Sequence, residues 1–226
     1  MFTRKRMRFQ LEIIWRALFF YFKYAVSLRQ VEELMRDRGV RVSHMSIYRW
    51  IMKFGPELES KFRKHKLPVN GSWRVDETYV KIAGEDRYLY RAVDKRGNTI
   101  DFLLTAKRDL KAARRFFKKA IRTSGAPLKA TLDKSGANLA GLESINNENR
   151  HQIEIRQCKY LNNIVEQDHR FIKKRIRGML GFKKFNSAKI ILAGVEVLHM
   201  IFKSQSGYMP LLHQDPIEAY WGLVRS

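Results

Sequence analysis

Three acidic residues, Asp76, Asp133 and Glu166, have positions in the sequence that suit metal-binding carboxylates. Asp76 lies within an apolar segment, Asp133 follows a short apolar one, and Glu166 opens a basic helical segment. Mg²⁺ and Mn²⁺ prefer carboxylate oxygens as ligands and do not need Cys or His side chains. Two such ions can activate a water or a 3′-hydroxyl group and stabilise the leaving oxygen of a phosphoryl transfer. We therefore expect Mg²⁺ or Mn²⁺, two ions per site, at these three carboxylates.

Each acid also has a structural interpretation. Asp76 also fits the solvent face of a half-exposed strand, and the neighbouring Glu77 is the alternative candidate for the site. Side chains of adjacent strand residues point to opposite faces, so only one of the two is expected at the site. Asp133 fits a turn. Glu166 fits a capping box opened by Asn163.

A basic stripe follows Glu166 at helical spacing, formed by Arg170, Lys173 and Arg177. A carboxylate at the head of such a stripe can hold a metal ion while the cations bind a DNA backbone. A solvated charged face is the competing interpretation. His169, one turn after Glu166, is more often a structural residue than a ligand, and no second His is spaced for zinc.

The charge of the chain indicates a polyanionic partner. Its 226 residues include 45 Lys and Arg against 22 Asp and Glu, a formal net charge of +23, while 45% hydrophobic residues provide a core. Cys158 is the single cysteine, which excludes an intramolecular disulfide and fits a reducing cytoplasm. Charged residues interrupt the apolar segments, so we expect no membrane span.

The N-terminal part predicts three helices, over residues 10–24, 28–38 and 45–54. A short turn containing Gly39 separates the second from the third, which is typical of a helix-turn-helix DNA-binding domain. A three-helix bundle without DNA gives the same pattern, but a basic N-terminal arm favours DNA. The residues of the third helix expected to contact DNA are Ser46, Tyr48, Arg49 and Lys53.

The second part predicts an RNase H-like α/β domain. Its expected elements are strands 73–82, 87–94 and 99–105, helix 110–122, strand 129–132, a helical or irregular segment 137–145, strand 152–156, and helices 164–180 and 187–202. Three antiparallel strands followed by two parallel ones make the first and fourth strands neighbours, and the helix that carries Glu166 is expected to pack across them, so Asp76, Asp133 and Glu166 are expected to converge. The expected domains are residues 1–66, 67–205 and a C-terminal tail, 206–226.

Three segments carry a family resemblance: VDETYVKIAGEDRYLYRAVDKRGNTIDF, TLDKSGAN, and KYLNNIVEQDHRFIKKRIRGMLGFKKFNSAKIILAGVEVLHMI. With the helix-turn-helix segment SLRQVEELMRDRGVRVSHMSIYRW, they resemble the DDE transposases of bacterial insertion sequence family six, in the retroviral-integrase-like superfamily. The resemblance implies Asp76, Asp133 and Glu166 as the catalytic triad. It also implies that Lys173 is the basic residue such enzymes place against the transposon end.

The function expected is therefore a transposase that binds terminal inverted repeats, nicks DNA and joins the 3′ ends to target DNA. The resemblance implies replicative transposition through cointegrates, and a homodimer or larger assembly on double-stranded DNA. We expect a cytoplasmic, nucleoid-associated protein. Two alternatives remain open: another RNase H-like nuclease, and a helix-turn-helix regulator without catalysis.

Overall fold

A computed structural model describes residues 8–133, 136–149, 152–158, 163–179, 181–208 and 215–226. Its contacts divide the chain into two compact units. The sheet unit comprises Leu67–Lys173. The helical unit combines Met1–Lys66 with Lys174–Ser226.

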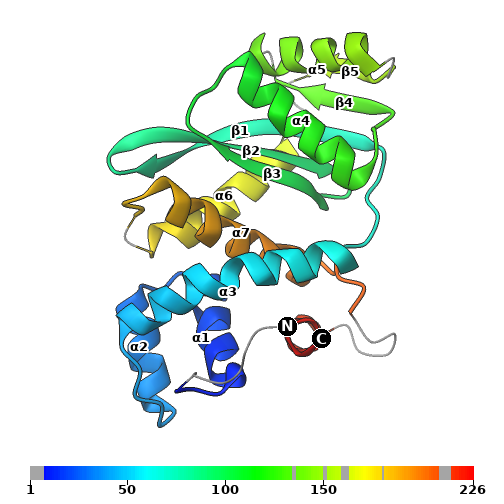
Figure 1. Cartoon of the computed structure of the whole chain (residues 1–226). Coiled ribbons are helices and arrows are strands. Elements are labelled where there is room, and N and C mark those ends of the chain that lie inside the picture. The colour runs from blue at the N-terminus through cyan, green and yellow to red at the C-terminus, as the bar shows by residue number, and fades with distance from the viewer. Residues whose placement is uncertain (1–7, 134–135, 150–151, 159–162, 180, 209–214) are drawn as a thin grey trace. The chain divides into compact units, whose positions relative to one another are not determined.

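The sheet unit is built on five strands in the spatial order β3-β2-β1-β4-β5 (Figure 1). These are β1 (Ser72–Ile82), β2 (Glu85–Asp94), β3 (Thr99–Thr105), β4 (Lys129–Leu132) and β5 (Glu154–Gln157). The first three pair antiparallel, and β4 pairs parallel with both β1 and β5. The predicted neighbourhood of the first and fourth strands is confirmed.

Helices cover both faces of this sheet. The helices of the unit are α4 (Leu110–Ser124), α5 (Gly136–Asn149) and the first part of α6 (Asn163–Arg177). One face buries Trp73 and Val75 of β1 against Phe116 and Phe117 of α4. The N-terminal part of α6 covers the other face (Figure 1). The order of strands and helices is that of an RNase H-like domain, as expected.

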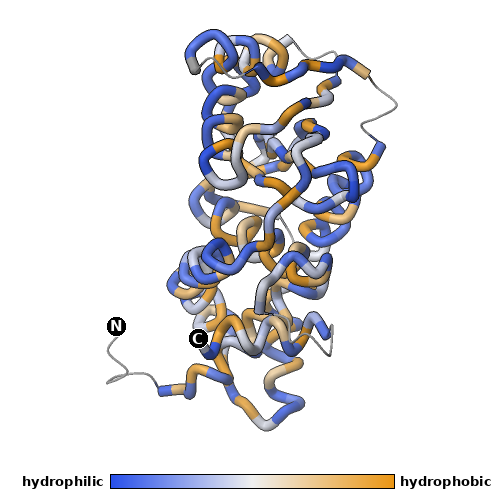
Figure 2. Tube along the Cα trace, turned by 90° about the vertical axis from the view of Figure 1, so that its right-hand side faces the viewer, coloured by the Kyte–Doolittle hydropathy of each residue, from blue (hydrophilic) through white to orange (hydrophobic). Residues whose placement is uncertain are grey.

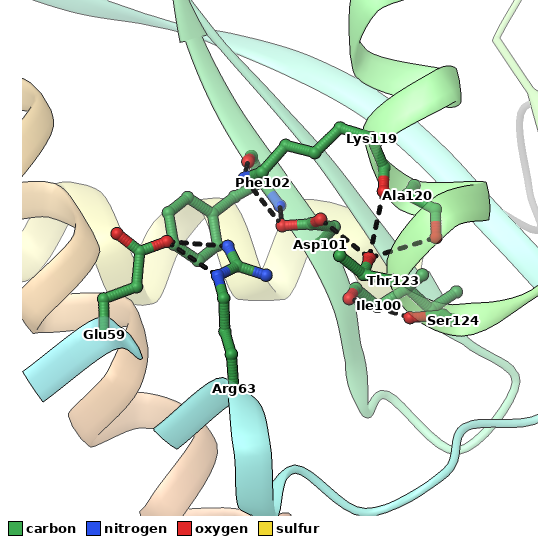
Figure 3. Close-up of polar contacts among 9 residues, drawn as sticks. All are labelled: Glu59, Arg63, Ile100, Asp101, Phe102, Lys119, Ala120, Thr123 and Ser124. Carbon is green, nitrogen blue, oxygen red and sulfur yellow. Dashed lines mark hydrogen bonds and ion pairs between the residues drawn. The ribbon is translucent and has the colours of Figure 1, made fainter. Parts of the chain in front are cut away.

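Two buried acids of the sheet unit have structural roles. Asp94 closes the β2–β3 turn: its carboxylate accepts the backbone N–H groups of Arg96 and Asn98. Asp101 of β3 is fully buried and accepts hydrogen bonds from Lys119 Nζ at 2.9 Å and Thr123 Oγ1 at 3.0 Å. Figure 3 shows these two α4 side chains directed toward Asp101.

The helical unit contains the predicted helix-turn-helix arrangement. Its helices are α1 (Leu11–Lys23), α2 (Leu28–Asp37), α3 (His44–His65), α7 (Phe185–Phe202) and α8 (Pro216–Arg225). Ser27 caps α2 and Ser43 caps α3, each accepting a backbone N–H three residues on. Gly39 in the turn has φ +76°, a conformation that favours glycine. Apolar and polar residues interleave along the trace of each unit (Figure 2).

Two helices differ from the expectation. α3 continues through Pro56 to His65, beyond the predicted end at residue 54. Leu58 and Phe62 are fully buried, and their burial offsets the cost of a proline within a helix. α8 forms within the segment named a tail.

The contacts group α7 with the N-terminal helices, whereas residues 187–202 were expected to belong to the second domain. The functional limits at 66 and 205 stay a prediction. α7 is long and apolar enough to cross a membrane by length and composition, but 67% of that window is buried within the protein. A buried core helix has the same composition.

Candidate active site

Strand register places Asp76 and Asp133 side by side. Val75 of β1 is the parallel partner of Leu132, the last residue of β4. Asp76 and Asp133 are the next residues on the two strands, so they stand where β4 ends and β1 continues. Ligand oxygens of Asp76, Glu77 and Asp133 all lie within 4.8 Å of one another.

Glu77 joins this group, which corrects the expectation that only one of the two neighbouring acids can. Its side chain projects from the face opposite to that of Asp76, as the pleat requires, toward Asn138 and Arg108. Asn138 Nδ2 donates to Glu77 Oε2 at 2.6 Å, and Arg108 forms an ion pair with the other oxygen. Asp133 lies just beyond the C-terminal end of β4, and the carboxylates of Asp76 and Glu77, from opposite faces of β1, both lie near it.

The other side of Asp76 contacts α6. His169 Nε2 lies 3.5 Å from Asp76 Oδ2. The preceding residue, Asp168, is the acceptor of a hydrogen bond from Arg91 Nη2 at 3.1 Å. The side chain of Arg91 is completely buried and that of Asp168 is 10% exposed. Asp168 is therefore a structural acid, and a buried ion pair joins α6 to the sheet beside Asp76.

Glu166 lies in the first turn of α6, half-buried and three residues before His169. It is not a member of the group of carboxylates within 4.8 Å that the described residues form. Helical spacing puts it on the same side of α6 as His169, which contacts Asp76. α6 begins at Asn163, and the residue before it lies outside the described residues, so the capping box stays a prediction. The basic stripe, Arg170, Lys173 and Arg177, is exposed.

Burial is the largest influence on the pKa values of Glu77 and His169. It raises the pKa of Glu77, against the opposing effects of Arg108 and Asn138. It lowers the pKa of His169, against the carboxylate of Asp76, so the imidazole is neutral at neutral pH. The arrangement is a set of hard oxygen donors, part-exposed at Asp133 (36%) and Asp76 (19%), which fits Mg²⁺ or Mn²⁺.

Three of the four residues expected to contact DNA from α3 share one cavity. Ser46, Arg49 and Lys53 line a cavity of about 290 Å³ together with Arg8. Phe9 and Trp50 also line it and pack edge to face, with ring centroids 5.2 Å apart. Tyr48 is not part of its lining; its hydroxyl group lies 2.8 Å from Ser187 Oγ of α7, within hydrogen-bond distance.

Arg91, Arg108 and Asn138 were not singled out from the sequence. Arg91 is a single charge among the apolar and aromatic residues of β2, and Arg108 precedes a helix in a basic segment. No local signal marks either as a partner of an acid. Asn138 is fully buried in the first turn of α5, two residues after Gly136. The composition of this segment is typical of a turn and does not indicate a contact with Glu77.

The chain is similar to known transposases along most of its length. A family model for the DDE domain of IS240-type transposases matches residues 70–205. The transposase for insertion sequence element IS257 in transposon Tn4003 of Staphylococcus aureus is 36% identical over 197 residues, 87% of each chain. The transposase for insertion sequence-like element IS431mec of S. aureus strain Mu50 is 35% identical over the same share.

Solved retroviral integrases are also similar. The HTLV-2 integrase catalytic core domain, in complex with magnesium and in a trimeric form, matches 58% of this chain and 86% of its own, with 20% identity and a TM-score of 0.46. The catalytic core domain of BIV integrase matches 67% of this chain and 94% of its own, with 16% identity and a TM-score of 0.46. The extent of the family match and the identity to the staphylococcal enzymes decide the assignment: the chain belongs to the DDE transposases of bacterial insertion sequences, in insertion sequence family six, and is an enzyme of that class.

Proposed function

We propose that this transposase binds the terminal inverted repeats of its own element, nicks the DNA to free 3′-hydroxyl ends, and joins these ends to target DNA. The observation that carries the proposal is the register of β1 and β4, which brings Asp76 and Asp133 together, both partly exposed, at the C-terminal end of β4 within a strongly basic chain. Carboxylates in such a chain need cations between them and the phosphates.

Asp76, Asp133 and Glu166 are the proposed catalytic residues and the ligands of two Mg²⁺ or Mn²⁺ ions. Such ions, when bound, make a water or 3′-hydroxyl group nucleophilic and stabilise the leaving oxygen. The chain's own contribution is to hold the donors. Strand pairing fixes Asp76 and Asp133, and contacts of α6 with the sheet orient the helix that carries Glu166.

Basic residues of both units would bind the DNA. Arg170, Lys173 and Arg177 are exposed along α6 and suit contacts to backbone phosphates. Ser46, Arg49 and Lys53, which share a cavity on α3, suit base edges and phosphates of the inverted repeat. Tyr48 does not line this cavity; its hydroxyl group contacts Ser187 of α7, and a DNA contact by Tyr48 would have to replace that interaction.

Joining two ends in concert needs two active sites, so we expect a homodimer or larger assembly on DNA. The relatives that this chain resembles are transposases of bacterial insertion sequences. Replicative transposition through cointegrates and a cytoplasmic, nucleoid-associated location follow from the same family membership as proposals.

The test separates chemistry from DNA binding. Asp76→Ala, Asp133→Ala and Glu166→Ala should each abolish joining of pre-cleaved ends in Mg²⁺ while retaining a mobility shift of end DNA, because affinity comes from the basic surface. Substantial joining by a purified variant would remove that residue from the triad.

Glu166 needs a sharper variant, since it also fits a helix cap. Glu166→Gln keeps the acceptor of a capping box and should change the free energy of unfolding by less than about 1 kcal/mol. It removes the charge that holds a divalent cation, so joining should be lost. Asn163→Ala is the matched control, expected to lower Tm more and to spare joining. Joining by Glu166→Gln at the wild-type rate would make Glu166 a capping residue only.

A further inference from the structure

Arg91 is a buried cation at the centre of the sheet. It is the antiparallel partner of Asp76 across β1 and β2, so both side chains project from the face that α6 covers. A guanidinium remains charged inside a protein, and its burial requires an anionic partner. Asp168 of α6 supplies one, with Oδ2 3.1 Å from Arg91 Nη2. A charged, directional contact therefore joins the helix to the sheet beside the proposed metal site.

His169 adds a second contact from the next residue of α6. Its Nε2 lies 3.5 Å from Asp76 Oδ2, and the ring is buried. Successive residues of an α-helix project about 100° apart, so two neighbouring contacts constrain the rotation of α6 about its axis as well as its distance from the sheet. The apolar contacts of Val165 and Ile172 do not do this alone, because hydrophobic contact is not directional.

Glu166 turns with the same helix. It precedes His169 by three residues, which places both on one side of α6. A rotation of α6 would therefore change the position of Glu166 relative to Asp76. We propose that the buried Arg91–Asp168 pair, assisted by His169, sets the rotation of α6 so that Glu166 faces Asp76. Arg91 and Asp168 are then positioning residues for the site, an inference that rests on the proposed function.

A matched control exists in the same sheet unit. Asp101 is also a buried carboxylate paired with a cation of a helix, Lys119 of α4, at 2.9 Å. Asp168→Asn and Asp101→Asn each break a buried ion pair between the sheet and a helix, and both should lower Tm. Only the first pair holds α6. Loss of stability alone therefore affects both variants, whereas loss of positioning affects only Asp168→Asn.

The measurement is the Mg²⁺ concentration that gives half-maximal joining of pre-cleaved ends, at a temperature below the unfolding transition of every variant. Partners that orient metal ligands typically change metal affinity when removed, so Asp168→Asn should raise this concentration about 10-fold or more. Asp101→Asn should leave it unchanged. Binding of Mn²⁺ without DNA, followed by the electron paramagnetic resonance signal of the free ion, should weaken in the same variant only.

Two further variants keep the test decisive if Asp168→Asn folds poorly. Arg91→Lys retains the charge but loses the planar fork, and should shift the Mg²⁺ requirement in the same direction by a smaller factor. Arg91→Met combined with Asp168→Asn should shift it no further than Asp168→Asn alone, because Asp168→Asn already breaks the ion pair that the two residues share. Equal shifts in the Asp168 and Asp101 variants, or no shift in either, would overturn the inference.

Asp76→Ala, measured alongside, separates this inference from the proposed function. Wild-type joining by Asp76→Ala would refute the site itself. An inactive Asp76→Ala together with an Asp168→Asn variant that behaves like Asp101→Asn would refute only the positioning role.

Discussion

Glu77→Gln perturbs the one buried carboxylate in the acidic group without changing its shape. The side chain of Glu77 is 5% exposed; one oxygen accepts from Asn138 Nδ2 at 2.6 Å and the other pairs with Arg108. A glutamine has one oxygen and one NH₂ group, so it can accept from one of these donors only. Asn138 is fully buried, whereas Arg108 is 34% exposed and can turn toward solvent. The amide oxygen should therefore face Asn138, and Arg108 should leave.

Two opposing effects set the magnitude. Losing a hydrogen bond to a charged group costs about 1.5–3 kcal/mol of folding free energy. Burial is the largest influence on Glu77 and raises its pKa, so the ionised carboxylate carries a desolvation cost that glutamine does not. The hydrogen-bond loss should win by a small margin, with a net destabilisation of about 1 kcal/mol. For a chain of this size that lowers Tm by about 2–4 °C.

The same change should weaken metal binding. Arg108 Nη2 lies 3.9 Å from Asp133 Oδ2, and a guanidinium released from Glu77 is free to approach Asp133 more closely. The cation then competes with Mg²⁺ for that carboxylate. We expect Glu77→Gln to raise the Mg²⁺ concentration for half-maximal joining of pre-cleaved ends, with stability measured in parallel by urea denaturation.

Removing the competitor is the control. Glu77→Gln combined with Arg108→Gln should restore a lower Mg²⁺ requirement, although it remains less stable than the wild type. The reasoning fails if Glu77→Gln is more stable than the wild type at neutral pH, or if the double variant needs as much Mg²⁺ as the single one.

Three further predictions concern the helical unit. Arg49→Ala should cost about 1–3 kcal/mol of binding to the correct DNA end and relax discrimination against scrambled DNA in competition assays; equal weakening on both would indicate a phosphate contact. Burial lowers the pKa of Lys23 to about 8 from an ordinary 10.5. The unfolded state therefore binds more protons between these values and stability rises with pH there. Lys23→Met should accordingly be more stable at pH 7 by less than about 1 kcal/mol, because the group is only half-buried, and urea denaturation should show this gain vanish above pH 10.5. Gly194→Ala should destabilise the protein by about 1–3 kcal/mol despite its better helix propensity, because the new Cβ would clash with the Phe22 ring; unchanged stability, or no rescue by Phe22→Leu, would contradict this packing.

Most elements could be predicted because their signals are local. Alternating residues of β1, the caps Ser27 and Ser43, and the turn at Gly39 each act within a few residues of chain, and the structure has them where the sequence indicated. α3 shows the limit of such signals. Pro56 reads as a helix end, but burial of Leu58 and its neighbours within the unit stabilises the helix through the proline.

The convergence of Asp76 and Asp133 was also determined by the sequence, through an intermediate step. The order of strands and helices implies that β1 and β4 are neighbours, and neighbouring parallel strands place residues of matching register together. The residue types and the family resemblance then pointed to metal-dependent phosphoryl transfer, and the comparisons confirm the family.

Only the tertiary structure decided which side chains surround these acids. Glu77 joins the group because β4 ends one residue before Asp133, and Arg91 is buried because α6 covers its face of the sheet with Asp168 above it. Periodicity indicates which face of a strand a residue occupies. The free-energy cost of burying its charge depends on whether another element places an oppositely charged side chain against that face. That partner lies far along the chain, so its identity is settled only when the helix packs on the sheet.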